Sequence, residues 1–131
     1  MNSPCVSTRR EGAVALIVMD RPPVNSLGAD LRSGLSAAVD AAMADGEVQA
    51  LVIIGTARAF SGGADVTEFN SPAALREPNL RQLIAQVEAC TKPVVAAISG
   101  VCLGGGLELA MGAHYRVASP DAQLGLPEVK L

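Results

Sequence analysis

Two short apolar runs, residues 50–54 and 94–98, constrain the fold of this chain more than any other feature. Each is five residues long and contains no polar side chain. Uninterrupted apolar runs of this length are typical of strands that are covered on both faces, as in parallel sheets. Two amphipathic segments, 29–44 and 79–89, carry apolar residues at three- and four-residue spacing, which predicts helices. Strands that alternate with helices predict an α/β layer structure.

Three further segments complete the predicted order of elements. Residues 13–19 read as a strand that ends in a Pro-Pro turn, and residues 115–118 resemble another strand. Before that second strand, the glycines at 104–106 open a short helix over 107–111. No segment could serve as a linker between domains and no internal repeat is present, so the 131 residues predict one domain or part of one.

Composition excludes several classes of protein. Half of the residues are apolar and 18% are charged, which is too apolar for a disordered tail. The net charge is −3, and the basic residues form no cluster in the sequence that would bind a nucleic acid. The apolar run 13–19 is shorter than the about 20 residues that span a bilayer, so we expect no membrane segment, and no signal-peptide pattern surrounds it. Cys5, Cys90 and Cys102 lack CxxC spacing, which predicts reduced thiols in a cytoplasmic protein. We expect Cys90 and Cys102 to act as small buried hydrophobes.

The low aromatic content predicts a thin core. The chain has only three aromatic residues, Phe60, Phe69 and Tyr115, and no tryptophan. Small side chains bury little apolar area each, at about 25 cal/mol per Å². We therefore expect additional packing surface to come from another chain, by self-association, or from further sequence.

The sharpest local feature is a pair of glycine-bearing loops. The glycines at 104–106 follow the strand at 94–98 and open a helix, which offers free backbone N–H groups to a negative group. The loop fits neither the phosphate-loop pattern nor the dinucleotide pattern, and its glycines alone are equally typical of tight strand–helix packing. A second loop, 59–65, also follows a buried strand. Two such loops can each give one N–H to the same oxygen, which is how an oxyanion hole is built.

Two glutamates stand close to these motifs in the sequence. Glu108 lies one turn inside the glycine-opened helix, and Glu128 follows Pro127. Paired carboxylates can move protons in general acid–base catalysis. Taken alone, each is more typical of a solvated residue, the first favoured by the helix dipole. The single histidine is His114. The sequence has no GxSxG motif that would supply a nucleophilic serine for a catalytic triad, so we expect a packing or hydrogen-bonding role for His114.

Four motifs together resemble those of the crotonase family, the enoyl-CoA hydratases and isomerases. They stand in the family's order and spacing, and the resemblance covers about residues 13–131. It is nearest to the N-terminal part of multifunctional fatty-acid β-oxidation enzymes, which carry a 3-hydroxyacyl-CoA dehydrogenase region downstream. The resemblance implies an α/β fold, a crotonase-like spiral of ββα units, of which residues 1–131 form a partial domain, the N-terminal half only. The motifs are Ala59-Phe-Ser-Gly-Gly-Ala-Asp65, Lys92-Pro-Val-Val-Ala-Ala-Ile98, Gly104-Gly-Gly-Leu-Glu-Leu-Ala110 and Gly125-Leu-Pro-Glu128.

The resemblance also implies roles for individual residues. The backbone N–H groups of Ala64 and Gly105 match the oxyanion hole that holds the thioester oxygen as it becomes an enolate. Glu108 and Glu128 match the two catalytic glutamates, one activating water for addition at Cβ and the other delivering the proton at Cα. No metal or redox cofactor is implied, because coenzyme A enters as part of the acyl-CoA substrate and its thioester is the electron sink. The positions that match the substrate-binding path are Val24, Ser26, Gly62, Asp65, Val66, Gly104 and Pro127.

The function implied by the resemblance is that of an enoyl-CoA hydratase, which adds water syn across trans-2-enoyl-CoA in fatty-acid β-oxidation. Isomerases of the family can work with the second glutamate alone, so the presence of both favours hydration and leaves isomerisation open. A different class also stays open: a truncated, non-catalytic CoA-binding or assembly fragment of a multifunctional enzyme.

Overall fold

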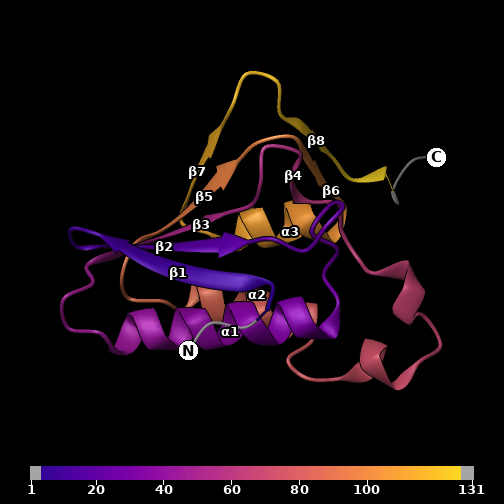
Figure 1. Cartoon of the computed structure of the whole chain (residues 1–131), viewed down its shortest axis with the longest axis horizontal. Coiled ribbons are helices and arrows are strands. Elements are labelled where there is room, and N and C mark those ends of the chain that lie inside the picture. The colour runs from indigo at the N-terminus through magenta and orange to yellow at the C-terminus, as the bar shows by residue number, and fades with distance from the viewer. Residues whose placement is uncertain (1–3, 128–131) are drawn as a thin grey trace.

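A computed structural model of the chain describes residues 4–127, which form two β-sheets and three α-helices (Figure 1). The strands are β1 (Val6–Glu11), β2 (Val14–Met19), β3 (Ala50–Ile54), β4 (Ala59–Ser61), β5 (Val94–Ile98), β6 (Val101–Leu103), β7 (Tyr115–Ala118) and β8 (Gln123–Gly125). The helices are α1 (Ala29–Ala44), α2 (Leu80–Glu88) and α3 (Gly105–Gly112), with two 3-10 turns, η1 (Val66–Glu68) and η2 (Pro72–Leu75). The larger sheet has the order β1-β2-β3-β5-β7 and the smaller has the order β4-β6-β8. β1 and β2 are antiparallel, and the other neighbouring strands are parallel.

The chain repeats one unit: a strand of the larger sheet, a strand of the smaller sheet and a helix. β3, β4 and α2 form one such unit, β5, β6 and α3 form the next, and β7 and β8 begin another. A parallel neighbour needs a crossover connection, so each helix returns the chain to the start of the next strand. The predicted α/β spiral of ββα units is therefore confirmed (Figure 1).

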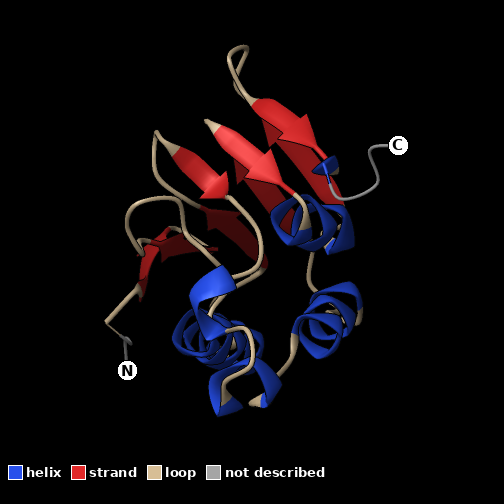
Figure 2. Ribbon diagram, turned by 90° about the vertical axis from the view of Figure 1, so that its right-hand side faces the viewer, coloured by secondary structure: helices blue, strands red, loops and turns tan. Residues whose placement is uncertain are grey.

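One face of the larger sheet is well covered and the other is not. α1 and α2 lie on the same side of this sheet (Figures 1 and 2). Along β2, β3 and β5, buried residues such as Ile17, Leu51 and Ile98 alternate with half-buried ones. The prediction that 50–54 and 94–98 are covered on both faces is therefore wrong for the described residues. An apolar run shows that polar groups are absent, but only the packed structure shows which neighbours are present.

Helix boundaries agree closely with the sequence. α1 has the predicted bounds, and α2 begins just after Asn79, which is its N-cap: Asn79 Oδ1 accepts from the Gln82 N–H, and the Gln82 side chain accepts from the Asn79 N–H. Such a reciprocal pair satisfies two N–H groups that the first turn leaves without partners. α3 begins earlier than predicted, because the glycines at 105–106 form its first turn.

The sequence analysis did not predict β1, β4, β6, β8 or the two 3-10 turns. β4, β6 and β8 are three residues each, too short to show a periodicity. β1 exposes every residue after Val6, so no apolar alternation marks it. Within residues 4–127, no helix is both long and apolar enough to cross a membrane.

Candidate active site

The first glycine loop runs from the end of β4 through Gly62 and Gly63 to Ala64. Two backbone hydrogen bonds tie it to the turn before α1: Gly62 N–H donates to the Val24 oxygen (2.7 Å), and Leu27 N–H donates to the Gly63 oxygen (2.8 Å). In a trans peptide the C=O and N–H groups point in opposite directions. The Leu27 bond therefore turns the Ala64 N–H, which shares a peptide unit with the Gly63 carbonyl, away from this turn.

The second glycine loop connects β6 to α3. Gly104 has φ +54°, in the left-handed region that favours glycine. Its N–H donates to the Gly125 oxygen (2.9 Å), and its carbonyl accepts from the Glu108 N–H (3.0 Å). The Gly105 N–H belongs to that same peptide and is one of the first N–H groups of α3, which have no partner inside the helix. It therefore points out of the positive end of the helix.

The two loops meet. A Cβ on Gly63 would lie 3.5 Å from the Gly105 nitrogen, and a Cβ on Gly105 would lie 3.8 Å from the Ala64 nitrogen. Both expected N–H donors therefore border one space, a pocket of about 400 Å³. The pocket is lined by Gly62, Gly63, Ala64, Val66, Leu80, Leu103, Gly104, Gly105, Glu108 and Pro127.

Glu108 brings a carboxylate to this pocket from the first turns of α3. The side chain is exposed, and it also lines a second space of about 350 Å³ between α2 and α3, with Leu80 and Ile84. The other expected catalytic residue, Glu128, lies outside the described residues. Its neighbour Pro127 is in the pocket lining. Of the expected site residues, the structure thus brings together Gly62, Ala64, Val66, Gly104, Gly105, Glu108 and Pro127.

Val24, Ser26 and Asp65 do not line this pocket. Val24 supports the first loop through its carbonyl. The Ser26 carbonyl accepts from Arg21 Nη1 (3.1 Å). Asp65 is 8% exposed. Its carboxylate accepts from the Thr67 hydroxyl (2.6 Å), the Thr67 N–H (3.0 Å) and Arg21 Nη2 (2.9 Å). These bonds, that of the Thr67 hydroxyl foremost, hold the pKa of Asp65 below its ordinary value although burial opposes them.

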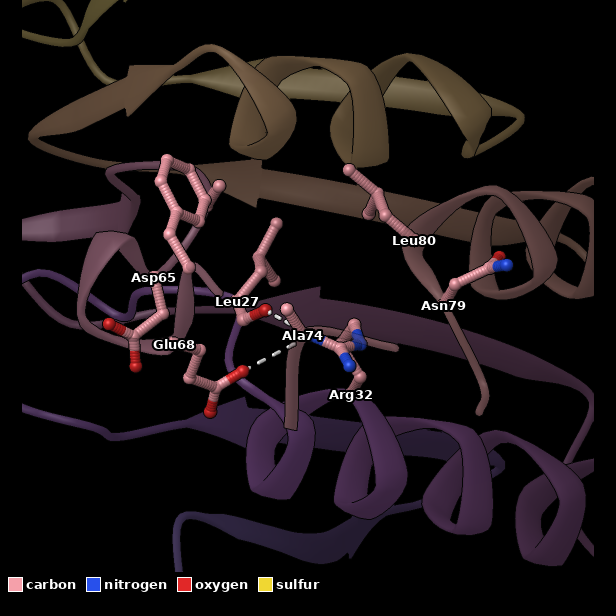
Figure 3. Close-up of a pocket in the computed structure, with 9 residues that line it drawn as sticks. Leu27, Arg32, Asp65, Glu68, Ala74, Asn79 and Leu80 are labelled. Atoms are coloured by element: carbon pink, nitrogen blue, oxygen red, sulfur yellow. Dashed lines mark hydrogen bonds and ion pairs between the residues drawn. The ribbon is translucent and has the colours of Figure 1, made fainter. Parts of the chain in front are cut away.

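A smaller cavity of about 170 Å³ adjoins the pocket, because Ala64 and Leu80 line both. Its polar lining residues are Arg32, Asp65, Glu68 and Asn79 (Figure 3). Arg32 Nη1 lies 3.7 Å from Glu68 Oε1. The buried Arg32 guanidinium donates to four carbonyl oxygens at 2.8–3.1 Å and so ties segment 73–78 to α1. These acceptors are the carbonyl oxygens of Leu27, Ala73, Arg76 and Pro78.

Sequence analysis missed this group of ionic residues, Arg21, Arg32 and Glu68. A signal for one of them was present, because Arg32 stands next to Leu31 on the apolar side of the predicted helix at 29–44. An arginine in such a place is buried only when its donors have partners. Three of the four carbonyl partners lie in segment 73–78, which had no predicted structure, so the pattern alone could not identify them.

His114 and the cysteines have structural positions. His114 Nδ1 accepts from the Val94 N–H (3.0 Å), and Nε2 lies 3.2 Å from the Glu88 oxygen. The expected hydrogen-bonding role of His114 is therefore confirmed. Cys102 is buried, as expected, and burial raises the pKa of its thiol to about 11. Cys90 is only half-buried, which corrects the expectation for that residue, because it lies near the end of α2 where packing is incomplete.

The sequence pattern of the enoyl-CoA hydratase/isomerase family matches residues 9–131. The chain belongs to this family. The resemblance seen in the four motifs is thereby confirmed. The fold agrees as well, since the structure is similar to a solved Pseudomonas aeruginosa DspI structure (TM-score 0.88, 31% identity, 97% of this chain and 54% of that one). It is also similar to a solved enoyl-CoA hydratase from Bacillus anthracis (TM-score 0.87, 30% identity, 95% and 51%).

Two curated relatives show how much of a longer protein this enoyl-CoA hydratase/isomerase chain matches. The peroxisomal bifunctional enzyme of Danio rerio is 51% identical over 119 residues, which are 91% of this chain and 16% of that enzyme. A probable enoyl-CoA hydratase of Bacillus subtilis is 42% identical over 123 residues, which are 90% of this chain and 48% of that protein. The chain therefore spans about a sixth of the first relative and about half of the second.

Within residues 4–127, no group of three or more His, Cys, Asp or Glu side chains is placed to hold a metal ion. The features that stand out in this family member are instead the paired loop N–H groups and the carboxylate beside them.

Proposed function

We propose that the protein hydrates trans-2-enoyl-CoA thioesters. One observation carries the proposal: the N–H groups of Ala64 and Gly105 border the same pocket as the Glu108 carboxylate. A thioester oxygen between the two N–H groups would be stabilised as it gains negative charge. One donor of an oxyanion hole is worth roughly 3–4 kcal/mol of transition-state stabilisation.

The two glutamates divide the proton transfers of this proposed reaction. One carboxylate removes a proton from water as its oxygen bonds to Cβ, and the other carboxyl group gives a proton to Cα on the same face. The electron pair of the Cα=Cβ bond passes into the thioester enolate and returns to form the Cα–H bond. Glu108 supplies one of these groups and Glu128 the other, and the reaction as proposed needs no metal or redox cofactor.

Isomerisation of the double bond is the second candidate, supported by the same family description. It would need one glutamate to move a proton between two carbons of the substrate. A non-catalytic CoA-binding fragment is a third candidate, supported by the share of each relative that the chain spans. Binding of acyl-CoA without turnover would favour it.

The deciding experiment is hydration of crotonyl-CoA by the protein, followed as loss of enoyl-thioester absorbance. Glu108→Gln and Glu128→Gln should each reduce the rate by at least about 100-fold. Ala64→Pro, which removes the N–H, should reduce it far more than Ala64→Ser. Equal rates in these two Ala64 variants would contradict the donor role, and unchanged rates in both glutamine variants would contradict hydration by two carboxylates.

The proposal extends to partners. In the sheet that residues 4–127 form, β7 is an edge strand, and its Tyr115 and Val117 are 64% and 61% exposed. Large exposed apolar side chains on one strand support self-association, or contact with a downstream dehydrogenase region of the kind that the family resemblance implies. Sedimentation of the chain with and without Val117→Lys tests self-association, since the charge should shift the species toward monomer.

The proposal places the protein in the cytoplasm, on the ground that its cysteine spacing is that of reduced thiols. Curated relatives carry peroxisomal or glyoxysomal names. Imaging of a fluorescent fusion against a peroxisomal marker decides between the two compartments.

A further inference from the structure

Ser61 is a polar residue with 0% exposure, located directly beneath the first glycine loop. Its hydroxyl makes two hydrogen bonds: it donates to the Asn25 carbonyl (2.8 Å) and accepts from the Gly63 N–H (3.1 Å). Both of its partners are backbone groups, and one of them belongs to the residue before Ala64. The hydroxyl therefore bridges the loop to the turn that precedes α1.

The bridge binds the N–H of Gly63, and a second hydrogen bond binds its carbonyl. The Gly63 N–H is bound to Ser61, and the Gly63 carbonyl accepts from the Leu27 N–H at 2.8 Å. Gly63 has φ +107°, a conformation open mainly to glycine and therefore one that needs external support to stay fixed. With both of its peptide groups bound, the direction of the Ala64 N–H is fixed too.

Asn25 gives the bridge a rigid base. It is 2% exposed and has φ +55°. Its Nδ2 donates to the carbonyls of Met19 (3.1 Å), Ala59 (3.1 Å) and Phe60 (3.2 Å), and its Oδ1 accepts from the Arg21 N–H. The turn before α1, the end of β2 and the start of β4 are thereby joined through one side chain. The carbonyl to which Ser61 donates is consequently immobile.

We propose that Ser61 is a positioning residue of the oxyanion hole, which aims the Ala64 N–H through the Asn25–Ser61–Gly63 bridge. This inference rests on the proposed function. Ser61 itself touches no substrate, because it is buried below the loop. A hydroxyl suits this place because it donates and accepts at once, whereas alanine would leave a buried carbonyl and a buried N–H unpaired.

The geometric demand explains why such a bridge would matter. Catalytic groups must be held within about 0.5 Å and 10–20° of their working geometry. In Ser61→Ala the Gly63 N–H is released, and rotation of the glycine peptides would move the Ala64 N–H off the thioester oxygen. We expect kcat for crotonyl-CoA hydration to fall about 10- to 100-fold with little change in KM, because the interaction strengthens only as the enolate forms.

The control is Ser36→Ala. The Ser36 hydroxyl also makes a side-chain hydrogen bond, to Gln86 Oε1 (2.7 Å), but it joins α1 to α2 and lies outside the oxyanion loops. Its loss should leave kcat unchanged. A kcat loss of the same size in both serine variants would overturn the proposal, since it would show a general effect on the fold.

A spectroscopic test separates this inference from the proposed function. The ligand is butanoyl-CoA with ¹³C at the thioester carbonyl; its acyl chain is saturated, so it cannot be hydrated. The isotope-edited infrared band of this carbonyl is recorded with the ligand bound to the protein. We expect a shift to lower frequency in the wild type and in Ser36→Ala, and a clearly smaller shift in Ser61→Ala. Equal shifts in wild type and Ser61→Ala would overturn the role of Ser61 alone. No shift in the wild type would overturn the oxyanion hole and, with it, both proposals.

A second variant keeps the test decisive if Ser61→Ala does not fold. Ser61→Cys retains a weak donor and acceptor in the same place. It should give a carbonyl shift smaller than that of the wild type, with faster hydrogen exchange at the Gly63 amide. A wild-type carbonyl shift in Ser61→Cys together with fast exchange at Gly63 would overturn the proposal.

Discussion

A methyl group on Gly105 would lie 3.8 Å from the backbone nitrogen of Ala64 and 2.8 Å from Leu80 Cδ2. Gly105 therefore keeps open the space between the two N–H groups that face the pocket. The first of these contacts is with Ala64 N, one of the two proposed donors to the thioester oxygen. The second is with the flexible end of a side chain, which can move aside.

Gly105→Ala should abolish ligand polarisation and hydration while the fold is retained. The methyl group would occupy the space that an oxyanion needs within about 3 Å of both donors. Stability should be unchanged or raised by about 0.5–1 kcal/mol, because alanine replaces glycine in a helix. Urea unfolding and crotonyl-CoA turnover measure the two effects. Gly46→Ala, in the turn after α1, is the control, because a Cβ there would meet no atom within 4 Å, and it should keep its activity. Full activity in Gly105→Ala would contradict the location of the site.

Gly106→Ala should do the opposite of its neighbour and damage the fold. A Cβ there would lie 2.3 Å from the Ser61 carbonyl oxygen, a backbone atom that cannot yield without moving β4. We expect a loss of about 2 kcal/mol or more in the free energy of unfolding, as for other overpacked sites. Thermal unfolding of the two alanine variants side by side is the measurement. Equal melting temperatures would show that β4 and α3 do not approach as closely as described.

Asp65→Asn should cost stability that depends on pH. The folded-state pKa of Asp65 lies below its ordinary value, chiefly because the Thr67 hydroxyl donates to it and also because Arg21 pairs with it. A depressed pKa stabilises the fold above the unfolded-state pKa of about 3.9, and this contribution is lost as the pH falls through the folded-state pKa. We expect a loss of about 1.5–3 kcal/mol at pH 7. The difference in free energy of unfolding between Asp65→Asn and the wild type should become smaller below about pH 4.

Urea unfolding at pH 7 and at acid pH measures this difference. The exposed carboxylate of Asp20 gives a matched control, and Asp20→Asn should change stability by under about 0.5 kcal/mol. If the difference in free energy of unfolding between Asp65→Asn and the wild type is constant from neutral to acid pH, the lowered folded-state pKa of Asp65 is contradicted.

Arg32→Met should loosen the segment that follows the first glycine loop. The side chain keeps its bulk, but Glu68 and four carbonyl oxygens lose their cation. We expect about 3 kcal/mol of lost stability. Trypsin should also cut faster after Arg76, whose carbonyl accepts from Arg32 (2.9 Å). Limited proteolysis followed by mass spectrometry measures the rate of cleavage after Arg76. The control is Arg81→Met, at an exposed position, in which trypsin should cut after Arg76 at the wild-type rate.

Native Cys102 should resist alkylation. Burial raises its thiol pKa to about 11, so almost no thiolate is present at pH 8. Cys90 also has a raised pKa because of burial, but it is half-buried and should react first. Iodoacetamide labelling followed by peptide mass spectrometry gives the order, with protein in guanidinium as the reference. Labelling of Cys102 in the native protein as fast as in guanidinium would contradict its burial.

Local sequence signals were sufficient for the elements of the spiral that are long and periodic. α1 has the bounds that its apolar spacing predicts, and β3 and β5 coincide with the two apolar runs. Such signals work because helix and strand periodicity, and the left-handed conformation that Gly104 adopts, are properties of a few neighbouring residues. The same reasoning placed both glycine loops after strands, in a chain that the family pattern then matched.

Only the tertiary structure decided what those loops do together. The Ala64 and Gly105 nitrogens come from segments about forty residues apart, and they face one pocket because β4 and β6 are neighbours in the smaller sheet. The part-buried pairing of Arg21 with Asp65 and the bridge through Ser61 likewise join distant segments. The sequence by itself determined the long, periodic elements, such as α1, β3 and β5, since the conformational preferences that mark them are local. The structure determined which of their polar groups meet, because strand order and packing set every contact between segments that are far apart in the chain.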